Sequence, residues 1–338
     1  MLEKSLTKGS LDGTPAPALR GLVLGYRAFR FGERIPRRWL VAPDGVVKVI
    51  LGFGGPLRLT DAVVEEPAVC ATSIVSGIGA TATVGEPLGP VCGVTLMLTP
   101  VAAYRLLGVP KQGPDGRNVD LVDLFGPQVE RLIGKLMEFT DWGARFALLD
   151  KVLAGRLLVG PASAPEVIQA WRKLQRTAGR TPVRQLATEV GWSRRQLERR
   201  FLEQVGLPPK SLAQVLRLQE ALRQRAGGLA WAEAAAVAGY HDQSHFARSF
   251  KAMVGCTPSS FFETHQAGIG RDGPLELLPQ KETSKAAPRR DSAGVAFVQD
   301  PSGGRGDAMK RQTTGSFPRS SLSMRSRLNP AGPTSRTT

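Results

Sequence analysis

The sequence predicts an α+β protein in which a mostly β N-terminal domain with a helical pair precedes an all-helical domain. Three observations lead to this prediction. Residues 22–100 contain short apolar runs separated by turn residues, and residues 129–157 show apolar side chains at helical spacing. A linker at 160–165 contains Gly and Pro, and beyond it helical spacing continues to residue 262.

Four apolar runs in the first half of the chain are predicted as strands, because each is short and bounded by turn sequences such as Pro43-Asp44-Gly45. These runs are Leu22–Phe31, Trp39–Ala42, Val46–Phe53 and Val91–Leu98. Residues 1–20 are polar and contain Gly and Pro, so we expect them to form a flexible arm.

Two apolar stripes with the period of an α-helix follow the strands. The first consists of Val129, Leu132, Ile133, Leu136 and Met137. The second consists of Phe146, Leu149, Val152, Leu153 and Leu157. We therefore expect residues 21–160 to form one domain that senses a signal or dimerises. Arg105, Trp39 and Tyr26 are candidates to line a ligand pocket there, although apolar and aromatic residues on strands more often belong to the core; the ligand is unknown.

The net charge of +16 is unevenly distributed. Residues 163–265 carry 15 basic and 8 acidic side chains, whereas residues 1–162 carry 18 and 15. A basic excess in one segment indicates a polyanionic partner, which charge alone leaves as DNA, RNA or an anionic membrane. Residues 270–338 are rich in Gly, Pro, Ser, Thr and Arg, so we expect a disordered basic tail.

Residues 182–204 have the pattern of a helix-turn-helix unit. Thr181-Pro182 predicts a helix start with Thr181 as the N-cap, and Gly191 predicts the turn. Ser193 and Gln196 form a capping-box pattern at the start of a second helix. Leu197 and Phe201 lie one turn apart and anchor that helix, so arginines lie on its opposite side, which suits insertion into a DNA major groove.

Residues 230–252 repeat this plan. Trp231, Ala234 and Ala235 form the buried face of a first helix, and Gly239-Tyr240 forms the turn. Asp242 is the predicted N-cap of a second helix, which Phe246 and Phe250 anchor. Between the two units, residues 209–225 are predicted as one long helix that fixes their spacing.

Residues 182–261 resemble the DNA-binding domain of the AraC/XylS family of bacterial transcription regulators. The resemblance rests on the run from Ser193 to Phe201 followed by Gly206, and on the run from Ala235 to Lys251 followed by Gly255-Cys256-Thr257-Pro258. It implies two recognition helices, 193–204 and 242–252, in successive major grooves. The N-terminal domain resembles the cupin-like sensor domains that often precede this module.

The resemblance and the helical wheel together give the candidate DNA contacts. Six side chains are candidates for reading bases: Arg195, Glu198, Arg199, Gln243, Ser244 and Arg248. Ala247 also matches an outward position of the family. Five side chains are candidates for contacting phosphates: Arg194, Gln196, Arg200, His245 and Lys251.

No catalytic residues, cofactor or metal site are predicted. His241 and His245 are four residues apart, but no glutamate lies between them, so a structural or phosphate-contacting role is favoured. One alternative is a DNA-repair enzyme fused to this module. That chemistry needs a zinc-held cysteine cluster, which Cys70, Cys92 and Cys256 lack the spacing to form. A nonspecific architectural DNA-binding protein is the other alternative.

We therefore expect a sequence-specific DNA-binding transcription regulator. Its predicted partners are double-stranded DNA, a second copy in a homodimer, an unknown small-molecule effector and RNA polymerase. No apolar run approaches the ~20 residues of a membrane span. Because the N-terminus also lacks a secretory pattern, we expect a soluble, cytoplasmic, nucleoid-associated bacterial protein.

Overall fold

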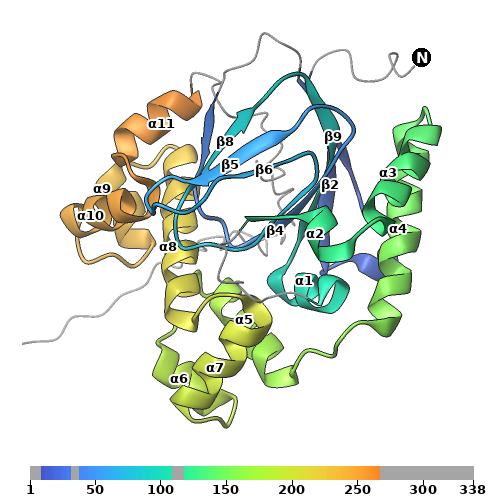
Figure 1. The fold of residues 1–338 in the computed structure, drawn as a ribbon. Coiled ribbons are helices and arrows are strands. Elements are labelled where there is room, and N and C mark those ends of the chain that lie inside the picture. The colour runs from blue at the N-terminus through green and yellow to red at the C-terminus, as the bar shows by residue number, and fades with distance from the viewer. Residues whose placement is uncertain (1–8, 32–37, 109–117, 267–338) are drawn as a thin grey trace, which may run out of the picture. The chain divides into compact units, whose positions relative to one another are not determined.

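The computed structural model describes residues 9–31, 38–108 and 118–266 (Figure 1). Two antiparallel sheets form most of its N-terminal part. The six-stranded sheet has the order β1 (Gly9–Gly13), β2 (Val23–Phe31), β9 (Val91–Leu98), β4 (Val47–Gly52), β7 (Ile74–Ser76) and β10 (Asn118–Asp120). The four-stranded sheet has the order β3 (Trp39–Val41), β8 (Thr83–Pro87), β5 (Leu57–Asp61) and β6 (Val69–Ala71). The predicted mostly β N-terminal part is confirmed.

The six-stranded sheet is apolar on both faces because each face covers a different core. One face packs against the four-stranded sheet through Phe29, Phe31, Ile50, Ile74 and Val91, which meet Trp39, Leu57 and Leu59. The opposite face carries Tyr26, Ala28, Val49, Leu51, Val94, Leu96 and Leu98 and contacts the helices. Strand β4 is buried along its whole length because it lies between these two cores, and its one charged residue, Lys48, pairs with Asp44.

Residues 9–20 correct the prediction of a flexible arm at 1–20; residues 1–8 lie outside the described residues. Gly9–Gly13 forms β1, which pairs antiparallel with β2 and places Ser10 opposite Phe29. A 3-10 turn, Pro17–Leu19, follows and buries the side chain of Leu19 completely. An edge strand needs only backbone hydrogen bonds from one neighbour, so a polar, Gly-containing segment can form it without an apolar pattern.

The four predicted strand runs correspond to β2, β3, β4 and β9, with ends that differ by at most one residue. The remaining short strands and α1 (Pro100–Leu107) were not individually predicted. The start of α1 had a local signal, because Thr99 accepts a hydrogen bond from the backbone N of Ala102 at 3.2 Å and Pro100 is its first residue.

The predicted helical pair is confirmed as α3 (Gln128–Glu138) and α4 (Trp142–Val159), preceded by the short α2 (Leu121–Phe125). Arg145 closes one end of this pair. Its Nε donates to the carbonyl of Leu136 at 2.9 Å, and its Nη2 donates to the carbonyl of Phe139 at 2.5 Å. The guanidinium carbon lies 4.4 Å from the ring centroid of Trp142. Burial lowers the pKa of Arg145, yet the group satisfies the last carbonyls of α3.

The rest of the described chain is helical. Its helices are α5 (Pro165–Arg176), α6 (Val183–Glu189), α7 (Arg194–Val205), α8 (Pro209–Ala226), α9 (Trp231–Val237), α10 (Gln243–Val254) and α11 (Pro258–Gln266). The predicted linker contains the short segment between α4 and α5, and the predicted long helix is α8. The predicted tail, 270–338, lies outside the described residues. No described helix is long and apolar enough to cross a membrane.

Candidate nucleic-acid interface

The first helix-turn-helix unit consists of α6, a turn at Gly191 and α7. Gly191 has a φ of 71°, a left-handed conformation that favours glycine. The N-cap of α7 is Ser193, whose hydroxyl accepts a hydrogen bond from the backbone N of Gln196 at 3.2 Å. Leu197 and Phe201 are completely buried. The predicted cap and anchors of this recognition helix are therefore confirmed.

One capping prediction in this unit is wrong. The N-cap of α6 is Pro182, not Thr181, and Pro182 has no side chain that could accept a hydrogen bond. Thr181 is buried, and its hydroxyl donates to the hydroxyl of Thr177 at 3.0 Å. Pro182 is itself extended, with φ −62° and ψ 142°, so the helix begins one residue later than predicted and Thr181 lies outside it.

The outward face of α7 carries charges of two kinds. Glu198 accepts a hydrogen bond from Nε of Arg194 at 2.8 Å, and Arg200 pairs with Glu203 at 3.0 Å. Arg195 and Arg199 are exposed and form no ion pair with any residue that the structure describes. Two guanidinium groups are thus unpaired and available to an anionic partner, while Arg194 and Arg200 are internally compensated.

The second unit consists of α9, a turn at Gly239 with a φ of 82°, and α10. The N-cap of α10 is Asp242, which accepts a hydrogen bond from the backbone N of His245 at 2.6 Å, as predicted. A further hydrogen bond joins Asp242 to the ring of His241 at 2.9 Å. The bond to His241 and then the backbone bond hold the pKa of Asp242 below its usual range. The carboxylate therefore stays ionised at the helix N-terminus, where negative charge is favourable.

An aromatic cluster anchors α10. The ring of Phe246 lies 5.4 Å from that of Trp231, 5.1 Å from that of Tyr240 and 5.7 Å from that of Phe250, measured between centroids. Phe246 and Phe250 are completely buried, as predicted. The guanidinium of Arg225 lies over the ring of Trp231 at 5.5 Å, a contact that the sequence pattern did not reveal. The one sequence feature that could have predicted it is the position of Arg225 near the end of α8 and of Trp231 at the start of α9.

The structure places ten of the eleven predicted DNA-contacting side chains in exposed positions at the starts and outer faces of α7 and α10. The exposed set is Arg194, Arg195, Gln196, Arg199 and Arg200 on α7, with Gln243, Ser244, His245, Arg248 and Lys251 on α10. Glu198 is only partly exposed because it pairs with Arg194. Their contact with DNA stays a prediction.

Two interactions connect the helix-turn-helix units to neighbouring helices. The buried side chain of Gln204, near the end of α7, accepts a hydrogen bond from the backbone N of Ala164 at 2.8 Å. Ala164 is the N-cap of α5. On α8, the guanidinium of Arg217 lies 5.4 Å from the ring centroid of Tyr240, so Arg217 contacts the turn of the second unit. The sequence offered no local signal for either contact, because the partners are far apart in the chain.

The other candidate residues lie apart from one another. Among the described residues, no cluster of three or more His, Cys, Asp or Glu side chains could hold a metal ion. Cys70 on β6, Cys92 on β9 and Cys256 after α10 are free thiols in three different elements. The candidate pocket residues separate as well, because Trp39 belongs to the core between the sheets and Tyr26 donates to Asp150 on α4 at 2.7 Å.

A comparison with protein families agrees with this helix-turn-helix geometry. A family model described as a helix-turn-helix domain matches residues 186–264. No curated protein matches the sequence. Among solved structures, ToxT from Vibrio cholerae O395 is 13% identical, with 70% of this chain and 96% of ToxT covered and a TM-score of 0.40.

Two other solved structures are similar in the same way. Wild-type ToxT from V. cholerae strain SCE256, bound to an unsaturated fatty acid, is 14% identical, with 78% of this chain and 96% of ToxT covered and a TM-score of 0.40. The C-terminal domain of AraT, a response regulator from Geobacillus stearothermophilus, is 19% identical, with 37% of this chain and 98% of that domain covered and a TM-score of 0.29. The family match and the two capped units lead to one conclusion: the C-terminal region of this chain is an AraC-type helix-turn-helix domain, which is a DNA-binding module.

Proposed function

We propose that this chain is a transcription regulator that reads a specific DNA sequence through two helices, α7 and α10, which enter successive major grooves on one side of the duplex. The proposal rests on three exposed arginines that have no ion-pair partner among the described residues. Arg195, Arg199 and Arg248 are exposed on the outer faces of these helices and form no ion pair with the described residues.

Unpaired arginines at these positions suit base recognition. The guanidinium group offers two parallel donors that match O6 and N7 of guanine, and a good pair of this kind is worth about 1–3 kcal/mol of discrimination. Arg199 and Arg248 each lie near the middle of a helix that is anchored on its opposite side by buried Leu or Phe residues. Grooves on the same side of DNA recur every ~10–10.5 base pairs, so the two arginines would read separate halves of one site.

The test is selection of binding sites from randomised DNA by the full chain and by two variants, Arg199→Ala and Arg248→Ala. We expect each variant to lose sequence preference in one half of the site, with the two halves about one turn apart. Lys251→Ala is the phosphate-type comparison, because Lys251 is exposed and in no ion pair with the described residues; its loss should weaken all sequences about equally and reduce the salt slope by about one. Arg223→Ala on α8 is the control, since Glu220 already pairs with it at 2.6 Å.

Two results would contradict the proposal. If both variants kept the parental preference and only lost affinity, the arginines would contact phosphates instead of bases. If the parental chain selected no sequence, the protein would be a nonspecific architectural DNA-binding protein, which is the alternative function. In both cases the helix-turn-helix fold would still stand.

We further propose that the N-terminal domain makes regulation respond to a small-molecule effector. The chain acts as a homodimer on the nucleoid DNA of the bacterial cytoplasm, with RNA polymerase as a partner. Support for dimerisation comes from the end of α4, where Leu158 and Val159 are 86% and 85% exposed. Large apolar side chains left in water commonly mark an interface. Light scattering of the full chain checks this point, and a monomer at micromolar concentration would contradict it.

A further inference from the structure

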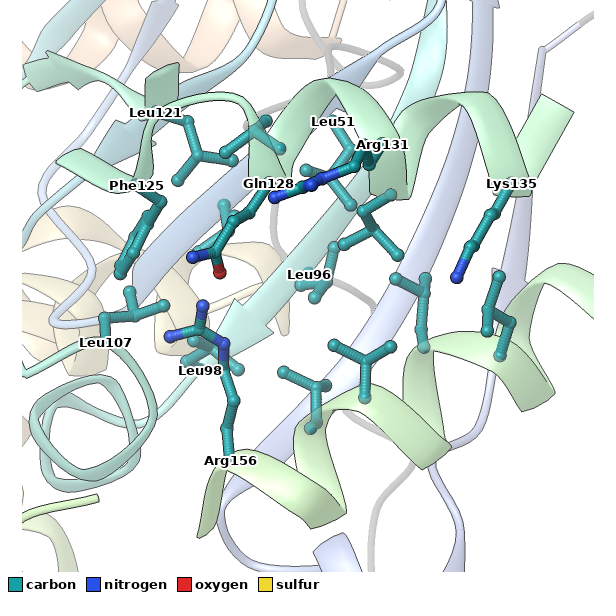
Figure 2. Close-up of a pocket in the computed structure, with 17 residues that line it drawn as sticks. Leu51, Leu96, Leu98, Leu107, Leu121, Phe125, Gln128, Arg131, Lys135 and Arg156 are labelled. Atoms are coloured by element: carbon teal, nitrogen blue, oxygen red, sulfur yellow. The ribbon is translucent and has the colours of Figure 1, made fainter. Parts of the chain in front are cut away.

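The N-terminal part of the structure contains a cavity of about 550 Å³ between the six-stranded sheet and the helices α2, α3 and α4 (Figure 2). Its floor consists of Val49 and Leu51 from β4 with Leu96 and Leu98 from β9. This volume lies within the range of about 300–1,000 Å³ that is usual for small-molecule sites. The cavity lies on the sheet face opposite to the sandwich core.

The walls of the cavity are also apolar for most of their extent. Leu132 on α3 and Leu148 and Val152 on α4 line it, and all three are only partly buried. In a filled core these side chains would be covered as completely as Leu136 on α3, which is fully buried and does not line the cavity. Their partial exposure means that apolar surface remains to be covered by an occupant.

Most of the polar side chains that line the cavity are cationic. Gln128, Arg131 and Lys135 lie at i, i+3 and i+7, which is one face of α3, and Arg156 lies near the end of α4. Figure 2 shows the side chains of Gln128, Arg131 and Arg156 directed towards the same part of the cavity, with Lys135 apart from them. No acidic side chain lines the cavity among the described residues. An anion is therefore the charge that this site would recognise.

The cations of the cavity are unpaired among the described residues, and one of them, Arg156, is held in position by an aromatic ring. Arg131, Lys135 and Arg156 form no ion pair with the residues that the structure describes. The guanidinium of Arg156 lies 4.8 Å from the ring centroid of Phe125, which holds it over the cavity. A cation that is already positioned loses less conformational entropy when an anion binds.

The space between the two sheets offers no comparable room, because large side chains occupy it. Phe29, Phe31 and Trp39 meet there, and the rings of Phe29 and Phe31 are 5.8 Å apart. In the described part of the chain, the apolar volume available to a ligand is thus on the helical side of the sheet.

We propose that this cavity binds an amphiphile with one anionic headgroup and one apolar chain. The headgroup lies between Arg131 and Arg156, with Gln128 as a further donor. The chain lies over Leu96 and against Leu132, Leu148 and Val152. This inference rests on the proposed effector response of the N-terminal domain and names the chemical class of that effector. The cluster of positive charge decides against a cationic ligand and disfavours a purely apolar one.

The test is displacement of a fluorescent apolar probe from the full chain, without DNA. Three competitors share one chain length and are used below their micellar concentrations: dodecanoate, dodecyl phosphate and dodecanol. We expect both anions to bind at least about tenfold more tightly than dodecanol, since hydrogen bonds to charged groups are worth about 1.5–3 kcal/mol each. The two anions distinguish a carboxylate site from a phosphate site.

Two variants separate the headgroup from the chain. Arg156→Gln should weaken dodecanoate about tenfold and leave dodecanol unchanged. Leu132→Trp fills the cavity and should abolish binding of all three competitors. The matched control is Arg30→Gln, because Arg30 is exposed on β2 of the same sheet and does not line the cavity. Thermal unfolding of each variant establishes that it folds.

Three outcomes would overturn the inference. Equal affinity for dodecanoate and dodecanol would remove the role of the cations. Failure of every competitor to displace the probe would show that the cavity takes no amphiphile. A dimer that dissociates only in Leu132→Trp, together with no amphiphile binding, would assign this face to a second copy of the chain. None of these outcomes depends on DNA recognition, which is measured separately.

Discussion

The first helix-turn-helix unit holds its recognition helix with Leu197 and a single aromatic residue, Phe201, whereas the second holds α10 inside a cluster of aromatic rings. The two helices also differ in the charge of their exposed faces. Helix α7 carries four arginines and two glutamates, while α10 carries Arg248 and Lys251. The same backbone plan can therefore be stabilised by different packing and can present a charged or a mainly polar face.

The largest expected effect concerns this difference in packing. Phe246 and Phe201 are both completely buried, but Phe201 has no ring contact among the described residues. Phe201→Leu should cost about 1–2 kcal/mol, because it removes three carbon atoms from a fully buried side chain. Phe246→Leu should cost at least about 2 kcal/mol, because each lost ring contact adds about 0.5–1.5 kcal/mol. Denaturant unfolding of the full chain measures both values, and equal losses would show that the aromatic cluster adds no stability.

The next effect distinguishes the two helix caps by pH. Ser193→Ala should cost about 0.5–2 kcal/mol at every pH, because a hydroxyl does not titrate in this range. The cap of α10 is a carboxylate whose pKa is lowered in the folded state by His241 and by the backbone of His245. A lowered folded pKa gives stability above the unfolded pKa of about 3.9, and this stability is lost as the pH falls through the folded value.

Two substitutions at Asp242 make this test specific. Asp242→Ala should lower the unfolding temperature near neutral pH and have less effect below about pH 4. Asp242→Asn keeps a capping oxygen but cannot ionise, so its difference from the parent should also shrink in acid. A constant difference between parent and Asp242→Asn from neutral to acidic pH would show that the charge of Asp242 contributes nothing.

The smallest effect concerns the charges on α7. Glu198→Gln removes the partner of Arg194 and one negative charge beside the proposed DNA face. We expect tighter binding to all sequences by up to about fivefold, the size of an exposed ion pair near 1 kcal/mol. Glu233→Gln on α9 is the control in the second unit, since Glu233 accepts from the backbone N of Ala230 at 3.1 Å. A change in sequence preference with Glu198→Gln, instead of in affinity, would assign Glu198 to base reading.

The sequence predicted those features that local chemistry determines. Ser193 and Asp242 were identified as caps because a cap and its partner lie three residues apart, and Phe201 and Phe246 as anchors because they follow the helical period. Strand β1 was missed because its pairing with β2 depends on a distant strand. Tertiary contacts of this kind leave no pattern within the segment itself.

The cavity illustrates the same limit at a candidate site. The apolar stripe of α3 was predicted, and Gln128, Arg131 and Lys135 lie one residue to the side of it. Nothing in the period indicates that α3 and α4 leave a gap over β4 and β9, because the gap depends on how far apart the helices and the sheet pack. Charged residues next to an apolar stripe usually lie at the solvent boundary of a helix.

Arg145 gives the helical pair a stiff end and a looser one. Its two hydrogen bonds to Leu136 and Phe139 fasten the turn between α3 and α4, whereas Gln128 and Arg156 lie at the far ends of the same helices. A small spreading of the pair would pivot at the fastened turn and grow towards the headgroup end. The site should therefore tolerate headgroups of different size and discriminate more strictly against changes in the part of the ligand nearest Arg145.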